Sequence, residues 1–258
     1  MSPEPLFVQT DGVYVPAEIT RGPWDPDALH GGAPAALFVH VLAQAPAARG
    51  LRLGRLTCEF VRPVPMAPLT LTTEVLRPGR RVALLDATML DPGGSVVARA
   101  RALFLAPSQL DADTGHAPPF AAPRDGRVND FADGPPMFAT HALELRFVEG
   151  AFREVGPATA WFRLRGPVLD DQPVLGAERM AVAGDFGNGI ASELSWSDHV
   201  FINPDLTLFF ERDPIGDWVA VQARMLLSPG AVALAEGVLW DERGRVGLAV
   251  QTLLVGRR

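Results

Sequence analysis

Hydrophobic and polar positions alternate along two stretches in different halves of the chain. Residues 69–76 and residues 218–225 each combine β-branched side chains with partial alternation, which is typical of strands that bury one face. Downstream of each stretch lies a turn rich in Asp and Gly, at residues 91–94 and at residues 241–244. Glycine reaches positive φ without strain, and Asp caps its own turn. The pattern predicts a meander of antiparallel strands in each half.

These two meanders belong to an internal repeat. When residues 206–255 are aligned with residues 56–106, matching residues recur at a nearly constant offset of roughly 150 positions. The matches join Leu56, Thr57, Phe60 and Asp91 to Leu206, Thr207, Phe210 and Asp241. Such self-similarity predicts two copies of one structural unit in a single chain.

One helix is predicted upstream of each meander. Residues 31–44 carry a proline in the first turn, where its missing N–H costs nothing. Residues 173–186 follow two aspartates that can cap a helix, and glycines come after them. Both segments carry few charges, so each helix is expected to be surrounded by other elements. The simplest packing is an α+β fold with two antiparallel sheets, each wrapped around a central helix.

A segment without periodicity separates the two halves. Residues 107–136 are rich in Pro, Asp and Gly, which is typical of a linker. We therefore expect an N-terminal unit over residues 1–106, a linker over residues 107–136 and a C-terminal unit over residues 137–258. The second unit is expected to open with strands at residues 138–148 and 158–164.

Composition and charge narrow the classes of partner. Hydrophobic residues make up 48% of the chain and charged residues 21%, which is the balance of a folded globular protein. The formal net charge of −7 offers no electrostatic footprint for nucleic acid or for an anionic membrane. A single cysteine, Cys58, excludes an intrachain disulfide and a cysteine-rich zinc site. No signal peptide or membrane-spanning stretch is evident, so we expect a cytoplasmic protein without a metal site.

Four short motifs follow one another in a set order. They are Leu-His-Gly-Gly at residues 29–32, Phe-Val-Arg-Pro at 60–63, Ala-Gly-Asp at 183–185 and Ala-Val-Gln at 249–251. Together with two helices wrapped by sheets, they resemble the type II acyl-CoA thioesterases, over roughly residues 20–255. The resemblance implies a double hotdog fold and a hydrolase of lipid metabolism. The substrate would be a small-molecule acyl thioester, with CoA as part of the substrate and no further cofactor. A homodimer is allowed but not required, because two fused units already supply the pairing that single-unit relatives obtain by dimerising.

The resemblance also implies a set of catalytic residues. An Asp on the second helix maps to Asp185, and a Gln on the last strand maps to Gln251. A hydroxyl-bearing position maps to Asn203, which departs from the family pattern, and Thr207 lies close enough in sequence to be that hydroxyl instead. These residues would hold a water against the thioester carbonyl. The third member stays open between Asn203 and Thr207.

Asp185 is unusual without any resemblance. On a helical wheel it shares a narrow stripe with Val174 and Ala181, so its carboxylate points where apolar side chains point. It also lies in the last turn, where the helix dipole is unfavourable to an anion. A general base explains this position. The alternative is a carboxylate that faces solvent, or one that pairs with Arg165 or Arg179.

Gln251 lies on a strand that is apolar on both faces and shares a face with Ala249 and Leu253. A buried amide needs hydrogen-bond partners. An active-site water and Asp185 would supply them, and neighbouring backbone groups are the alternative.

His30, Gly31 and Gly32 open the first predicted helix, where free N–H groups point outward. Glycine lets a carbonyl oxygen approach these groups, so the segment is a candidate oxyanion hole and substrate-binding site. The alternative is a plain turn with His30 as a cap.

Two further functions compete with thioester hydrolysis. One is a non-catalytic acyl or acyl-CoA binding protein on the same fold. The other is a hotdog enoyl-CoA hydratase or dehydratase, which would need a His–Asp or His–Glu pair facing one pocket, and only His30 and His40 lie near a predicted helix. A serine hydrolase of the α/β type is disfavoured because the chain has no G-x-S-x-G motif.

Overall fold

The computed structural model describes residues 3–107, 116–129, 135–170, 172–228, 230 and 232–258. The strands of the first half are β1 (Phe7–Thr10), β2 (Val13–Pro16), β3 (Arg52–Phe60), β4 (Leu69–Arg77), β5 (Val82–Leu90) and β6 (Val96–Leu105). Those that follow are β7 (Arg127–Val128), β8 (Leu143–Glu149), β9 (Ala158–Leu164), β10 (His199–Ile202), β11 (Asp205–Phe210), β12 (Trp218–Leu226), β13 (Ala233–Asp241) and β14 (Gly244–Arg257). The helices are α1 (Gly32–Ala43), α2 (Gly176–Gly184) and α3 (Gly187–Ile190), with a π-helical turn, η4 (Phe138–Ala142).

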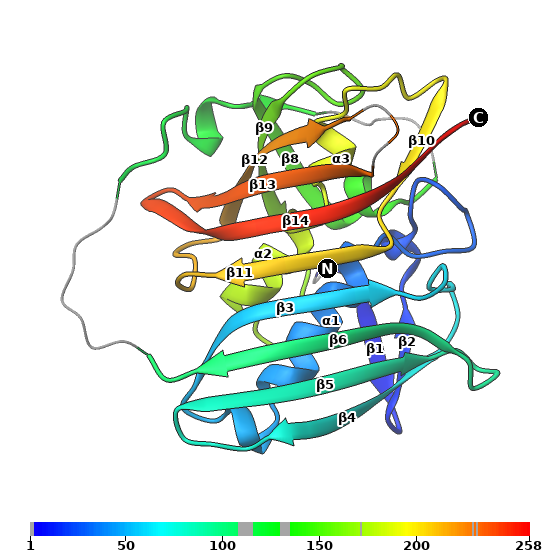
Figure 1. The fold of residues 1–258 in the computed structure, drawn as a ribbon, viewed down its shortest axis with the longest axis vertical. Coiled ribbons are helices and arrows are strands. Elements are labelled where there is room, and N and C mark those ends of the chain that lie inside the picture. Colours follow the sequence, from blue (N-terminus) through cyan, green and yellow to red (C-terminus); the bar gives the residue numbers. More distant parts are fainter. Residues whose placement is uncertain (1–2, 108–115, 130–134, 171, 229, 231) are drawn as a thin grey trace.

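Within the described residues, the strands form one continuous antiparallel sheet, with α1 and α2 behind its central strands in Figure 1. The order along the sheet is β1-β2-β4-β5-β6-β3-β11-β14-β13-β12-β9-β8-β7, and β10 pairs with β14. The two meanders meet where β3 pairs with β11. The prediction of two separate sheets is therefore wrong, because hydrogen bonds between the halves join both meanders into one sheet.

The junction between the halves pairs equivalent residues of the repeat. Thr57 of β3 lies opposite Thr207 of β11, and Leu56 lies opposite Leu208. Since Thr57 and Thr207 are equivalent in the repeat, the two meanders are related by an approximate two-fold axis through this pair. Neither strand is left as an open edge, where unpaired N–H and C=O groups would be exposed.

The two longer helices pack against each other and run in opposite directions. The segment before α1 meets the end of α2, where His30 contacts Asp185. The end of α1 meets the first turn of α2, where His40 contacts Glu178. Most of α1 is buried, which confirms that this weakly charged helix is surrounded by other elements.

Helix α2 is shorter than the sequence pattern predicts. It begins at Gly176, where the Leu175 N–H donates a hydrogen bond of 2.9 Å to Oε2 of Glu178. It ends at Gly184, so that Asp185 occupies the C-cap position and the chain continues into α3. The sequence pattern predicts one helix over residues 173–186. The structure instead has two helices, because α2 ends at Gly184 and α3 begins at Gly187.

A buried His–Glu pair links α1 to α2. Nδ1 of His40 lies 2.6 Å from Oε1 of Glu178, and Nε2 of His40 lies 2.6 Å from the amide nitrogen of Gln44. An amide nitrogen only donates, so Nε2 accepts and Nδ1 carries the proton that is donated to Glu178. Every polar atom of this buried pair therefore has a partner.

The segment predicted as a linker contributes to the sheet. Arg127–Val128 forms β7 and pairs with β8, although residues 108–115 and 130–134 lie outside the described residues. The strand expected from residue 138 begins only at Leu143, because Phe138–Ala142 forms the π-helical turn η4. The division of the chain into two units and a linker stays a prediction.

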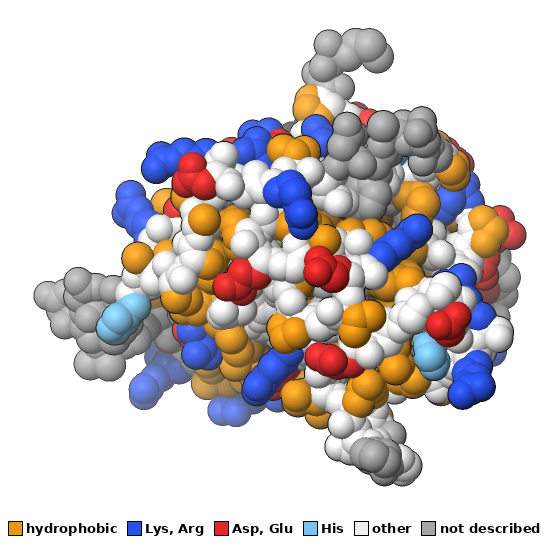
Figure 2. Space-filling model, turned by 90° about the horizontal axis from the view of Figure 1, so that it is seen from above, with side chains coloured by type: hydrophobic (Ala, Val, Ile, Leu, Met, Phe, Trp, Pro, Cys, Tyr) orange, Lys and Arg blue, Asp and Glu red, His pale blue; other side chains and the backbone are white. Residues whose placement is uncertain are grey.

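The surface carries charges of both signs. On the face shown in Figure 2, basic and acidic side chains are interspersed with hydrophobic ones. The chain contains no lysine, so its basic side chains other than histidine are arginines. Among the described residues, no helix is both long enough and apolar enough to cross a bilayer.

Candidate active site

One large cavity, of about 1110 Å³, lies where the segment before α1 meets the end of α2. The first half of the chain lines it with residues 21–25, 28–31 and 60–64. The second half lines it with residues that include 185–186, 188–189 and 202–204. The two halves of the repeat therefore build this cavity together.

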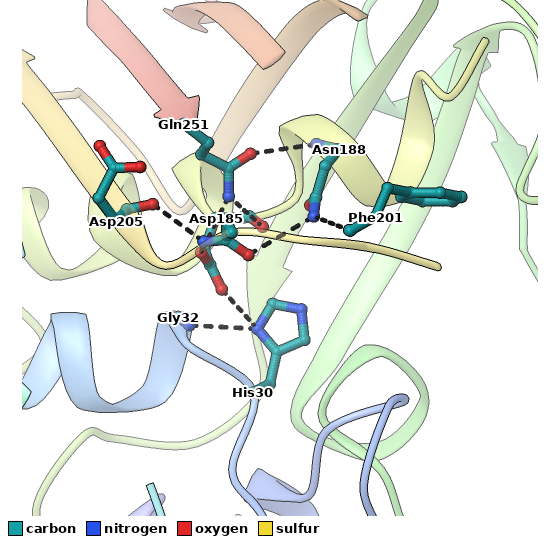
Figure 3. A network of polar contacts seen from close by, with 8 residues as sticks. His30, Gly32, Asp185, Asn188, Phe201, Asp205 and Gln251 are labelled. Atoms are coloured by element: carbon teal, nitrogen blue, oxygen red, sulfur yellow. Dashed lines mark hydrogen bonds and ion pairs between the residues drawn. The ribbon is translucent and has the colours of Figure 1, made fainter. Parts of the chain in front are cut away.

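Asp185 is the carboxylate at the centre of the site in Figure 3, and its exposed fraction is 3%. Oδ1 accepts hydrogen bonds from Nδ2 of Asn203 at 2.8 Å and from Nε2 of Gln251 at 3.0 Å. Oδ2 lies 2.9 Å from Nδ1 of His30. Two amide donors, joined by His30 when its Nδ1 carries the ring proton, thus offset the desolvation of the carboxylate and the unfavourable dipole at the end of α2. The alternatives in which Asp185 faces solvent or pairs with an arginine are wrong.

The two arginines considered as partners of Asp185 point elsewhere. The guanidinium of Arg165 donates to the carbonyl oxygen of Leu143 at 2.9 Å, and that of Arg179 donates to Asp217 at 3.2 Å. The Asp185 carboxylate therefore contacts neutral amides and a histidine rather than the guanidinium of Arg165 or Arg179.

Gln251 of β14 is almost completely buried, with an exposed fraction of 1%. Besides Oδ1 of Asp185, its amide nitrogen donates to the Asp185 carbonyl oxygen at 3.2 Å, and its Oε1 accepts from the backbone N–H of Asn188 at 3.1 Å. Both amide protons are used by Asp185. Gln251 is not among the described residues that line the cavity, so it orients Asp185 from behind.

Asn203 lies between β10 and β11 and lines the cavity. Its Nδ2 donates to Oδ1 of Asp185 and, at 3.1 Å, to the carbonyl oxygen of Asp205. Thr207, the other candidate for this position, contacts Thr57 across the junction of the halves at 3.4 Å. The structure therefore places Asn203 at Asp185, whereas Thr207 lies at the pairing of β3 with β11 and does not line the cavity among the described residues.

His30 packs against two aromatic rings and lies beside Asp185. Its ring stacks on Phe186 with centroids 4.4 Å apart and tilts against Phe138 at 4.9 Å. Its Nδ1 lies 3.1 Å from the backbone N–H of Gly32 as well as 2.9 Å from Asp185. One nitrogen cannot accept from Gly32 and donate to Asp185 at once. Nδ1 therefore donates to Asp185 when it carries the ring proton, and accepts from the Gly32 N–H when it does not.

The two glycines differ in their surroundings. Gly32 does not line the cavity among the described residues, and its N–H is directed at Nδ1 of His30. Gly31 lines the cavity, and its N–H has no acceptor among the described backbone groups. A Cβ at Gly31 would lie 2.8 Å from Oδ2 of Asp185, so only glycine fits between this carboxylate and Phe60.

Asn188 of α3 is a member of the site that the sequence did not reveal. It is buried, lines the cavity, and donates through Nδ2 to the Phe201 carbonyl oxygen at 2.9 Å. The flanking glycines, Gly187 and Gly189, were the available signal, since a Cβ at Gly187 would lie 2.9 Å from Oε1 of Gln251. Asn188 thus anchors Gln251, which in turn anchors Asp185.

Three other titratable groups are buried and do not line the cavity. Burial raises the pKa of the Cys58 thiol, and the charges of Asp185, Glu59 and Asp205 raise it further, so the thiol stays protonated. The pair of His40 and Glu178 does not line the cavity. Within the described part of the chain, no cluster of His, Cys, Asp or Glu is arranged to hold a metal ion.

Comparisons with known proteins identify the family of the chain. The sequence model of the acyl-CoA thioesterase N-terminal domain matches residues 20–105, and that of the acyl-CoA thioesterase C-terminal domain matches residues 114–255. The comparison with curated protein sequences gives no match.

Solved structures share the fold at low sequence identity. A protein of unknown function with a hot dog fold from Alicyclobacillus acidocaldarius is 19% identical with a TM-score of 0.76, over 97% of this chain and 95% of that one. Acyl-CoA thioesterase II TesB2 from Mycobacterium marinum is 19% identical with a TM-score of 0.65, over 99% and 94%. The TesB protein of Mycobacterium avium subspecies paratuberculosis is 18% identical with a TM-score of 0.67, over 95% and 93%.

Proposed function

The chain belongs to the acyl-CoA thioesterase family, and from that premise we propose that it hydrolyses acyl thioesters in the cavity beside Asp185. The observation that carries the proposal is a buried carboxylate that lines the cavity and is oriented by donors from both halves of the chain. Its Oδ1 accepts from two amides, whereas Oδ2 contacts only Nδ1 of His30 among the described side chains and keeps a lone pair for a water.

Asp185 acts as the general base in the proposed reaction. The water on Oδ2 gives up a proton to Asp185 as its oxygen forms a bond to the thioester carbonyl carbon. The carbon–sulfur bond then breaks, the proton passes to the departing sulfur, and the products are a carboxylic acid and a thiol. His30, at 2.9 Å from Oδ2, holds the carboxyl in place and can share that proton.

The developing negative charge on the carbonyl oxygen needs a donor. Gly31 lines the cavity beside Asp185, and its N–H has no acceptor among the described backbone groups. We assign this N–H to the carbonyl oxygen, since an aimed backbone donor stabilises the transition state where charge develops. Aromatic and apolar side chains of the cavity, among them Phe60 and Met137, would surround the acyl group.

The test is a thiol-release assay on acyl-CoAs of several chain lengths with the wild type and Asp185→Asn. Asparagine keeps the shape and loses the base, so we expect the turnover number to fall by about a hundredfold or more. The variant should still bind a non-hydrolysable thioether analogue in calorimetry. Asp217→Asn is the matched control, because Asp217 is an exposed carboxylate that contacts Arg179. If the wild type binds acyl-CoA but does not hydrolyse it, the proposal of hydrolysis is wrong and the protein is a non-catalytic acyl-CoA binding protein.

A second candidate function rests on the contact between His30 and Asp185. A His–Asp pair that faces one cavity is what a hotdog enoyl-CoA hydratase or dehydratase needs, and both residues line this one. Such an enzyme adds the oxygen of water to the β-carbon of an enoyl thioester and a proton to the α-carbon. Loss of enoyl-CoA absorbance without thiol release would assign this activity in place of hydrolysis.

The proposed hydrolysis needs only water and a thioester, so we propose no cofactor. A cytoplasmic location and a homodimer remain proposals as well. Light scattering on the eluted protein measures its oligomeric state.

A further inference from the structure

Three of the described glycines line the cavity, and two of them are crowded. A Cβ at Gly22 would lie 3.2 Å from backbone atoms of the segment before α1, and a Cβ at Gly31 would lie 2.8 Å from Oδ2 of Asp185. A Cβ at Gly189, by contrast, would meet no atom within 4 Å beyond its own stretch of helix. A side chain at Gly189 would therefore project into open space.

The backbone does not require glycine at this position either. Gly189 lies in α3, and its N–H donates to the Phe186 carbonyl oxygen at 3.0 Å. Its φ lies outside the left-handed region, in contrast to every other described glycine that has open space in front of it. Glycine in a helix is less stable than alanine, because its backbone loses more conformational freedom on folding. Neither backbone nor packing therefore accounts for a glycine here.

The two glycines that flank Asn188 differ in this respect. A Cβ at Gly187 would lie 2.9 Å from Oε1 of Gln251, so a side chain there would displace the amide that orients Asp185. A side chain at Gly189 would displace no part of the described chain. The remaining reason for the missing side chain is that a ligand occupies this part of the cavity.

The open space at Gly189 lies close to the proposed base. Asp185 and Gly189 are four residues apart, and the backbone between them is helical, with the Ile190 N–H donating to the Phe186 carbonyl oxygen at 3.0 Å. Residues four apart on a helix lie roughly 5–6 Å from each other on one side. Both residues line the cavity. A thioester with its carbonyl at Asp185 therefore brings the atoms next to that carbonyl in front of Gly189.

Aromatic side chains wall the cavity on the side of α3. Trp24 and Trp196 stack with ring centroids 4.8 Å apart, and Phe152 packs on Trp196 at 5.6 Å. All three line the cavity. Phe201 meets both indole rings edge-on, and its carbonyl oxygen accepts from Nδ2 of Asn188 in α3 (Figure 3). This contact fixes the cluster of rings to α3, next to the open space.

The aromatic wall favours an acyl group as the occupant. Burial of apolar groups against aromatic rings is favourable, whereas the amides of a pantetheine arm would give up hydrogen bonds to water there. A straight acyl chain is narrow and can run along the cavity without filling the space in front of Gly189. A ring or a branch near the carbonyl fills that space.

We propose that Gly189 is a specificity-determining residue, whose missing side chain leaves room for a ring or a branch close to the carbonyl of the acyl group. This inference rests on the proposed function, because the thioester must reach Asp185. It narrows the substrate class to acyl groups that are wider near the thioester than a straight chain. It also assigns the limit on their width to a single position in α3.

The test compares octanoyl-CoA with cyclohexylacetyl-CoA, which has the same number of acyl carbons, and with acetyl-CoA. In the wild type we expect a higher kcat/KM for cyclohexylacetyl-CoA than for octanoyl-CoA. Gly189→Leu fills the open space and should lower the ratio of kcat/KM for cyclohexylacetyl-CoA to that for acetyl-CoA by about a hundredfold. Gly189→Ala adds one methyl group and should lower the same ratio by roughly three- to tenfold.

A stability measurement separates this role from a structural one. Alanine fits at position 189 without a clash and is a better helix former, so Gly189→Ala should raise the melting temperature by about 1–4 °C while it lowers the ratio. A glycine kept for the fold would lower the melting temperature when replaced. Gly256→Ala is the matched control, because Gly256 does not line the cavity among the described residues and a Cβ there would make an ordinary contact with Val200. It should leave the ratio unchanged.

Several outcomes overturn the inference. A wild-type preference for octanoyl-CoA, or a lower melting temperature in Gly189→Ala, would each do so. Equal losses on all three thioesters in Gly189→Leu would assign the space to the thiol arm instead.

Failure of the proposed function is distinguishable from failure of this inference. If the wild type hydrolyses none of the thioesters, the proposed function fails, and calorimetry with non-hydrolysable thioether analogues of octanoyl-CoA and cyclohexylacetyl-CoA still tests Gly189. The wild type should bind the cyclohexylacetyl analogue more tightly, and Gly189→Leu should lose that preference. Equal binding of the two analogues by the wild type would overturn the inference.

Discussion

Nε2 of Gln251 lies 3.0 Å from Oδ1 of Asp185, although 66 residues separate them along the chain. The contact joins β14, the last strand along the chain, to the end of α2. Gln251 also holds the backbone of Asp185 and is itself held by Asn188. The orientation of the proposed base is thus set by a buried chain of amides, in which Asn188 lines the cavity and Gln251 does not.

Replacement of Gln251 by leucine removes this support. Oδ1 of Asp185 loses one of its two donors, and the N–H of Asn188 loses its acceptor. We expect kcat for thioester hydrolysis to fall about tenfold, which corresponds to about 1.4 kcal/mol, with KM changed less than about twofold. Thr252→Val on the same strand is the control in steady-state kinetics. A larger effect on KM than on kcat would show that Gln251 contacts the substrate instead.

Asn203 and Thr207 give a second comparison. Asn203→Leu should reduce kcat strongly because the Oδ1 contact of 2.8 Å is lost, whereas Asn203→Thr restores a donor and should retain more activity. Thr207→Val should change kcat less than about twofold, since the side-chain partner of Thr207 is Thr57 at 3.4 Å, a weak contact. The assay is hydrolysis of one acyl-CoA at saturation. Equal losses in Asn203→Leu and Thr207→Val would contradict the assignment.

The pair of His40 and Glu178 should matter for stability. Glu178 is fully buried, and its removal leaves His40 and the Leu175 N–H without their acceptor. We expect Glu178→Ala to lower the free energy of unfolding by about 3–5 kcal/mol. The exposed ion pair between Arg52 and Asp213 supplies the control, and Asp213→Ala should cost less than about 1 kcal/mol. Urea unfolding followed by circular dichroism measures both, and similar losses would refute the distinction.

Asp241 makes stability depend on pH in a defined direction. Burial alone would raise the pKa of its carboxyl, but hydrogen bonds from Arg212 and from the N–H groups of Ile215 and Arg243 outweigh burial and lower that pKa. A lowered pKa in the folded state stabilises the protein above the unfolded value, and this contribution is lost as the pH falls through the folded pKa.

The variant Asp241→Asn should therefore be less stable than the wild type at neutral pH. Its deficit should stay constant down to about pH 5 and shrink below about pH 4, near the pKa of an unfolded Asp. Thermal unfolding at a series of pH values measures the difference. A deficit that grows towards low pH would contradict the lowered pKa.

The arrangement of the site was predictable only in part. The pattern around Asp185 indicated a carboxylate among apolar side chains, and its burial is confirmed. The sequence could not show whether Asn203 or Thr207 contacts Asp185. Asn203 precedes β11 and Thr207 lies within it, and the sequence alone does not show which of the two side chains faces Asp185. Nothing in the sequence showed that His30 would reach Asp185.

The sequence by itself determined the repeat, the strand meanders and the two buried helices, because these depend on local periodicity and turn chemistry that each half carries alone. Tertiary structure decided how the halves combine. Pairing of Thr57 with Thr207 joins two expected sheets into one, and opposed helices bring His30 to Asp185 at one end and His40 to Glu178 at the other. Such contacts form when buried surfaces of segments far apart in the sequence pack together. The local pattern of hydrophobic and polar residues does not show which of these segments will meet.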